Sequence, residues 1–342
     1  IYLWTEEPTQ KLILYPLGKE DTFYEIPDGT ISIGEKSFKN SFVNVINMSD
    51  SVVSLDPYAL YECSALYSLN IGRGLEKIAD TSIYDCYKIA NITVDENNAY
   101  FKSINGILFS KDESELIKYP TQLKEKTYAI PLTVTTIKYN CFYSNRFLKN
   151  IIITDNVSFI DQHSVRSCEQ IMSFEVTENN QFFAAFDDIL YLKNFSRIVL
   201  VPQKKEGNYT LHENLTRFEG NLFSKRNINY INIPNKITYI NSYTFNSCGK
   251  LQSIIIPDSV TMIDFGAFIN CLALQNVEIG KNVRWIGSSV FNGCKMLKSI
   301  TIPKLVSNIS SNLFFGCVNL TSITFCGNIY YIDIGAFGFC YS

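Results

Sequence analysis

The sequence contains ten cysteines, a residue type that can form disulfides or bind metal ions when it recurs at short spacings. Cys141 and Cys326 have no C-x-x-C partner, so neither belongs to a zinc motif. The other eight occupy one position of a repeating pattern: Cys63, Cys86, Cys168, Cys248, Cys271, Cys294, Cys317 and Cys340. A position fixed by a repeat period is a packing position, where a free cysteine behaves as a small hydrophobic residue. We therefore expect buried thiols, although repeats stacked about 5 Å apart leave a disulfide geometrically possible.

Residues that could act in acid–base or nucleophilic catalysis are few and scattered. The two histidines, His163 and His212, stand in different parts of the repeat array, away from the periodic cysteines and from acidic clusters. Glu25, Glu175 and Glu278 fall at equivalent positions but never in successive repeats, so no carboxylate pair forms. No glycine-rich phosphate loop occurs. The sequence thus predicts no enzyme, no catalytic residue, no metal site and no cofactor.

The cysteines close a pattern with a period of 23 residues, which is clearest from Leu251 to Ser342. The phenylalanines follow the same interval: Phe268, Phe291, Phe314 and Phe337. So do the leucines that open each unit: Leu251, Leu274, Leu297 and Leu320. A fixed period of this length is typical of a solenoid, whose units cannot bury their apolar side alone and must stack.

Each unit contains apolar, often β-branched residues two positions apart, which is the pattern of a short strand. In one unit, Ile254 and Ile256 are expected to point inward, Ser253 and Ile255 outward, and Pro257 to end the strand. The last inward position can be traced through the chain: Ile26, Met48, Ile71, Val94, Ile130, Ile153, Val176, Leu211, Ile233, Ile256, Ile279, Ile302 and Phe325. We predict a β-rich solenoid, a curved right-handed coil with one short parallel strand in each rung of about 23 residues.

A second kind of unit separates the rungs. The segments 95–120 and 177–202 share Glu-Asn-Asn, an aromatic residue, an Ile-Leu pair and a closing proline at identical spacing, and each is predicted to form a β-hairpin around a polar turn. The segment 1–16 is the end of a third copy. The rung arrays would then cover about 17–94, 121–176 and 203–342 of one solenoid, 1–342. Since the chain starts at Ile1 and stops within a repeat, we expect a fragment whose last rung exposes apolar surface.

The pattern L-x-x-I-x-I-P-x-x-V-x-x-I-x-x-x-A-F-x-x-C, matched most closely over Leu251–Cys340, resembles the BspA-like leucine-rich repeats, also called the Treponema type. The resemblance covers nearly the whole chain, and the hairpin segments with I-L-F-S-K-D and K-Y-P are similar to those that interrupt arrays in that family. The first two arrays depart from it, for example with Asn145 at the cysteine position. The resemblance implies a binding protein of the surface-antigen or adhesin kind.

The outward strand positions are the predicted binding face. They form two columns that are rich in hydroxyl and amide groups and nearly uncharged. The candidate ligand-binding residues are Ile152, Asn208, Tyr230, Asn232, Ser253, Ile255, Asn276, Glu278, Ser299 and Thr301. Small polar residues could equally be there because they fit a crowded sheet, and both interpretations stay open. Tyr230, Ile152 and Ile255 are the candidate anchors, because large apolar side chains are otherwise needlessly exposed there.

The composition of the chain excludes some classes of binding partner. The net charge of −3 and a pI near 5.6 argue against nucleic acid, and no apolar run reaches the roughly 18 residues of a membrane span. The leading hypothesis is a non-enzymatic adhesion protein, a cell-surface or secreted antigen that binds a host or extracellular-matrix protein, with glycan as a further candidate partner. The alternative is an intracellular, cytoplasmic leucine-rich-repeat scaffold for protein–protein interaction, which free thiols would suit equally well.

Overall fold

The computed structural model describes residues 11–16, 18–19 and 21–342. These residues form strands and turns and no helix. The chain divides into two compact units: unit 1 comprises Ile1–Ile171 with Val176–Phe182, and unit 2 comprises Met172–Glu175 with Phe183–Ser342. Strand β16 (Ser173–Val176) crosses the division. The expected hairpin remnant at 1–16 lies largely outside the described residues.

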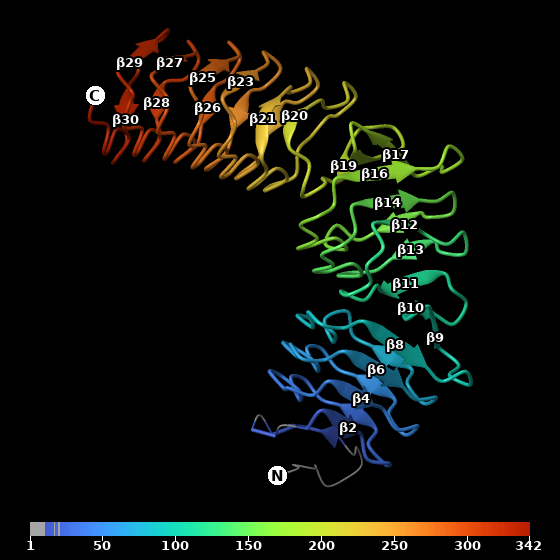
Figure 1. The fold of residues 1–342 in the computed structure, drawn as a ribbon. Coiled ribbons are helices and arrows are strands. Elements are labelled where there is room, and N and C mark those ends of the chain that lie inside the picture. Colours follow the sequence, from blue (N-terminus) through green and yellow to red (C-terminus); the bar gives the residue numbers. More distant parts are fainter. Residues whose placement is uncertain (1–10, 17, 20) are drawn as a thin grey trace. The chain divides into compact units, whose positions relative to one another are not determined.

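Unit 1 carries the expected strand of each rung in what we call the main ladder. Its strands are β2 (Phe23–Glu25), β4 (Val45–Asn47), β6 (Ser68–Ile71) and β8 (Asn91–Val94), followed after the hairpin by β12 (Thr127–Ala129) and β14 (Asn150–Ile153). The pairing is parallel and stacks like on like: Tyr24 on Ile46, Ile46 on Leu69 and Leu69 on Ile92. Strands β2, β4, β6 and β8 lie side by side in the blue to teal part of Figure 1. Each repeat of the sequence therefore contributes one strand, and equivalent residues of successive repeats pair in the sheet.

Unit 2 continues the pattern in its own main ladder. The strands are β20 (Gly207–Tyr209), β21 (Ile228–Ile231), β23 (Ser253–Ile256), β25 (Asn276–Ile279), β27 (Ser299–Ile302) and β29 (Ser322–Phe325). Ile254 pairs with Val277, and Ile300 with Ile323. Ile254 and Ile256 are buried and Ile255 is exposed, as the alternation predicted. The solenoid class predicted from the sequence is confirmed.

A second ladder accompanies the first, which the sequence pattern did not predict. It consists of two-residue strands: β1 (Lys11–Leu12), β3 (Ser32–Ile33), β5 (Ser54–Leu55), β7 (Lys77–Ile78), β13 (Thr136–Ile137), β15 (Phe159–Ile160), β22 (Tyr239–Ile240), β24 (Met262–Ile263), β26 (Trp285–Ile286), β28 (Asn308–Ile309) and β30 (Tyr331–Ile332). Pairing within it is parallel, for example Ile263 with Ile286. In most of these strands one residue is buried in the core, whereas both residues of β30 are exposed. The three-residue spacing of Val260 and Ile263 therefore includes a strand that is too short to show alternation.

The two internal hairpin units each contain three antiparallel strands. The first has β9 (Phe101–Ile104), β10 (Ile107–Ser110) and β11 (Glu115–Lys118), and the second has β17 (Phe183–Phe186), β18 (Ile189–Leu192) and β19 (Ile198–Leu200). The expected hairpin around residues 111–114 is present, and a tight turn at Asn105 and Gly106 adds a strand before it. Both turn residues have positive φ, as an Asn-Gly hairpin requires.

The core of unit 2 is a column of phenylalanine rings. Phe245, Phe268, Phe291 and Phe314 are fully buried, and successive ring centroids lie 5.1, 5.7 and 5.8 Å apart with nearly parallel planes. Phe337 continues the stack at 5.8 Å. Each ring covers its neighbour, so a rung gains most of its buried apolar area from the rungs on either side.

Candidate functional site

Eight of the ten predicted binding residues lie on strands of the main ladder of unit 2, on the side facing away from the core, and Asn232 directly follows β21. The register aligns them in two columns: Asn208 with Tyr230, Ser253 with Asn276, Ile255 with Glu278, Ser299 with Ser322, and Thr301 with Thr324. Parallel pairing repeats each side chain about 4.8 Å from its equivalent in the next rung. The strands pair two by two, β20 with β21, β23 with β25 and β27 with β29, and neighbouring pairs lie next to one another, so unit 2 presents a face built from a small set of side chains.

Two large apolar side chains stand out on this otherwise polar face. Ile255 is 51% exposed and Tyr230 is 40% exposed. Their neighbours Asn276, Glu278, Ser299 and other members of the columns are hydroxyl, amide or carboxylate side chains open to solvent. An exposed isoleucine and tyrosine beside small polar groups form the kind of patch that protein partners cover.

Two predicted residues are placed differently from the rest. Asn232 is half-buried, and its side chain bonds to the backbone of Leu211: Oδ1 accepts the N–H at 2.6 Å and Nδ2 donates to the carbonyl at 3.2 Å. This side chain thereby extends the pairing beyond the end of β20 and is occupied within the protein. Ile152 lies in unit 1, where it pairs with Ala129 and is half-buried.

The face offers no arrangement for bond-making chemistry. Glu278 is the one carboxylate among the candidate residues, and its paired neighbour is Ile255. Within the described part of the chain, no group of three or more His, Cys, Asp or Glu side chains could hold a metal ion. His163 bonds to Asp161 and His212 stacks on Phe195, so both imidazoles have local structural partners.

Comparison with known proteins agrees with this architecture. The family profile described as "BspA type Leucine rich repeat region (6 copies)" matches residues 20–129, 121–188 and 216–342. The chain belongs to the BspA-type leucine-rich repeat family. A search of curated proteins gave no significant match.

Several solved structures share the fold of this BspA-type repeat chain. A leucine-rich repeat protein from Eubacterium ventriosum is 19% identical with a TM-score of 0.68, over 94% of this chain and 85% of that one. The pneumococcal vaccine antigen PcpA is 16% identical with a TM-score of 0.62, over 96% and 86%. A leucine-rich cell surface protein from Faecalibacterium prausnitzii is 21% identical with a TM-score of 0.55, over 95% and 93%. At these identities the likeness shows the fold alone. The described residues contain no helix that could cross a lipid bilayer.

Sequence reasoning missed a second exposed column on this BspA-type chain. Tyr239, Met262 and Trp285 pair in register along the second ladder, and Met262 and Trp285 are 37% and 39% exposed. Tyr239 donates a 2.5 Å hydrogen bond to Asp264, which raises the pKa of the tyrosine to about 12. The signal was present in the sequence as a large side chain directly before Ile240, Ile263 and Ile286.

Proposed function

We propose that this BspA-type chain is a non-enzymatic, surface-displayed adhesion protein that binds another protein, such as an extracellular-matrix or host surface protein, through the main-ladder face of unit 2. The observation that carries the proposal is the pair Tyr230 and Ile255, exposed on the neighbouring strands β21 and β23 of a polar, nearly uncharged face. Aromatic and aliphatic anchors surrounded by small polar groups are typical of interface hot spots. The named cell-surface protein and vaccine antigen with the same fold support display at the surface.

The direct test is binding to immobilised fibronectin, laminin and type I collagen, measured by biolayer interferometry. Tyr230→Ala and Ile255→Ser should each weaken binding of the captured partner by at least about tenfold, since hot-spot truncations cost about 2 kcal/mol or more. Met262→Ser is the matched control, because Met262 is similarly exposed but lies on the second ladder. Equal binding by all four proteins would reject the anchor assignment, and no binding to any matrix protein would reject this class of partner.

Display at the surface is tested separately on intact source cells with a membrane-impermeant biotin reagent. The chain should be labelled while a cytoplasmic marker stays unlabelled. Labelling only after lysis would favour the second candidate function, an intracellular scaffold for protein–protein interaction. One observation supports that alternative: all ten cysteines are free, and eight of them are buried. Reduced thiols are the rule in the cytosol.

A further inference from the structure

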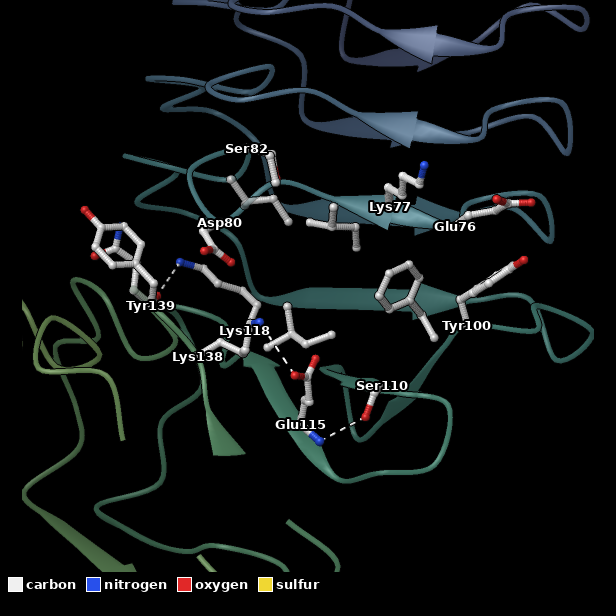
Figure 2. A pocket seen from close by; sticks show the side chains of 16 residues that line it. Glu76, Lys77, Asp80, Ser82, Tyr100, Ser110, Glu115, Lys118, Lys138 and Tyr139 are labelled. Carbon is white, nitrogen blue, oxygen red and sulfur yellow. Dashed lines mark hydrogen bonds and ion pairs between the residues drawn. The ribbon is translucent and has the colours of Figure 1, made fainter. Parts of the chain in front are cut away.

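Unit 1 contains a cavity of about 330 Å³ that lies where the first hairpin interrupts the second ladder. Strand β7 ends one run of that ladder and β11 begins the next, and no pairing joins them. The cavity is lined from both sides, by Ile78, Ala79 and Ser82 on one and by Ile117, Lys118 and Asn140 on the other. Figure 2 shows Ser82 and Lys118 on opposite sides of the opening, with Tyr100 and Tyr139 at its edge. The interruption of the repeat thus creates a hollow that an uninterrupted ladder would fill.

Lys118 is the unusual residue in this cavity. Its side chain is 5% exposed, its ammonium donates a 3.2 Å hydrogen bond to the carbonyl of Asn140, and it lies 5.7 Å from the centre of the Tyr143 ring. No carboxylate among the described residues forms an ion pair with it: the nearby Asp85 accepts hydrogen bonds from Tyr143 and Tyr87 instead. Burial lowers the pKa of the Lys118 ammonium, and the charge of nearby Asp85 offsets this only in part.

Two buried side chains beside Lys118 also lack partners. Ser82 and Asn140 both line the cavity. The Oγ of Ser82 and both polar atoms of the Asn140 amide are buried without a hydrogen bond. Buried polar atoms without partners each cost about 1–3 kcal/mol. Together with two of the three ammonium hydrogens they leave an excess of donors at one place. A ligand that accepts hydrogen bonds and carries negative charge would satisfy them.

The fold does not require a lysine at position 118. The second hairpin has the same register, with Lys118 opposite Leu108 in the first and Leu200 opposite Leu190 in the second. Leu200 is 5% exposed, so an apolar side chain fills the equivalent position of an otherwise similar hairpin. A charged residue that burial penalises, where leucine would serve the fold, points to a ligand.

We propose that this cavity binds a small monoanionic carboxylate, with the ligand's carboxylate held by Lys118, Asn140 and Ser82 and its body packed against the apolar wall. That wall consists of Ile78, Ile83, Phe101 and Ile117. A dianion such as phosphate fits less well, because the three lysines that line the cavity, Lys77, Lys118 and Lys138, are already balanced in charge by three acidic side chains: Glu76, Asp80 and Glu115. The site lies in unit 1 and is independent of the binding face proposed above.

Isothermal titration calorimetry with four acids tests the proposal and distinguishes two classes of carboxylate ligand. Hexanoate and benzoate represent free organic acids, and D-glucuronate and N-acetylneuraminate represent acidic sugars. At least one should bind saturably, with its carboxylate required: hexanamide and benzamide should bind at least tenfold more weakly than the corresponding acids. Inorganic phosphate should not compete. If none of the acids saturates, or the amides bind equally well, water fills the cavity and the proposal is wrong. Equal binding of phosphate would also overturn it.

Substitutions copied from equivalent positions elsewhere in the chain test whether the carboxylate binds in this cavity. Lys118→Leu copies Leu200 and should weaken carboxylate binding at least tenfold. Asn140→Gly should weaken it several-fold, and it keeps the backbone sound because Asn140 has a φ of 53° and Gly266, at the equivalent position of another rung, has 59°. Lys138→Ala removes a cation at the edge of the cavity and should have little effect. Each variant is compared with the parent by circular dichroism, and unchanged affinity in a folded Lys118→Leu protein would reject the assignment.

Discussion

The thiol of Cys294 donates a 3.3 Å hydrogen bond to the backbone carbonyl of Phe268 in the preceding rung. That carbonyl also accepts the N–H of Cys271 at 3.2 Å, so one oxygen joins two rungs. The relation recurs along the chain: Cys63 to Phe38, Cys86 to Leu60, Cys168 to Phe142, Cys248 to Phe223, Cys271 to Phe245, Cys317 to Phe291 and Cys340 to Phe314. The position therefore suits cysteine because the side chain must be small and apolar and still donate one weak hydrogen bond.

The burial of the periodic cysteines predicts which thiols react. Burial raises the pKa of Cys168, Cys248 and Cys317 to about 12, so these side chains hold almost no thiolate at pH 8. Cys326 is exposed and should react with Ellman's reagent at once, and the half-buried Cys340 should follow slowly. The other eight should react only in denaturant. Cys326→Ser should abolish the fast phase. Rapid release of several equivalents of thionitrobenzoate from the native protein would contradict the burial of the other thiols.

The phenylalanine column predicts a gradient of stability. Phe291 is fully buried between Phe268 and Phe314, and truncating a ring in such a place costs about 3–5 kcal/mol. Phe337 is only partly buried and stacks on one described ring, that of Phe314. Urea denaturation should therefore show a markedly larger loss of unfolding free energy for Phe291→Ala than for Phe337→Ala. Similar losses would mean that the rungs do not share their core as the structure indicates.

The buried lysine predicts a pH-dependent stability difference. The pKa of Lys118 in the folded chain lies below its ordinary value of 10.5 because of burial. Between the folded and unfolded pKa values of Lys118 the unfolded state binds more protons, so the free energy of unfolding rises with pH. Below the folded pKa, the folded state carries the full cost of the buried charge. Lys118→Met should thus stabilise the ligand-free protein at pH 7, and its advantage should disappear as the pH approaches 10.5. Urea denaturation of both proteins across pH 7–10.5 measures this difference, in which the tyrosine titrations cancel. A constant difference would be evidence against the shifted pKa.

Periodicity predicted the solenoid because each inward side chain meets its own equivalent in the next rung, so position in the repeat fixes position in space. Ile254, Ile256 and the ring of Phe268 are buried as expected. The second ladder was not predicted, since a two-residue strand such as Trp285–Ile286 has no measurable alternation. The carboxylate cavity could not be predicted either. Lys118 resembles any surface lysine in a hairpin until the structure shows what covers it.

The buried asparagine of each hairpin unit explains the shared Glu-Asn-Asn motif and gives the last prediction. Asn98 is fully buried, and its Nδ2 donates to the carbonyls of Gly72 and Leu75 at 2.9 and 3.0 Å. Its Oδ1 accepts the N–H groups of Tyr100 and Phe101 at 2.9 and 2.8 Å. The side chain thereby joins the end of one rung to the start of the hairpin.

Asn98→Ala would leave four backbone groups without a partner inside the protein, so we expect a loss of at least about 3 kcal/mol in unfolding free energy. Asn98→Asp should be nearly as harmful, because a carboxylate oxygen would face the two carbonyls that now accept from Nδ2. The adjacent Asn97 is exposed, and Asn97→Ala is the matched control with an expected change within about 0.5 kcal/mol. Urea denaturation compares the three variants. If Asn98→Ala and Asn97→Ala behaved alike, the hairpin would be held by its apolar contacts, and the motif would need another explanation.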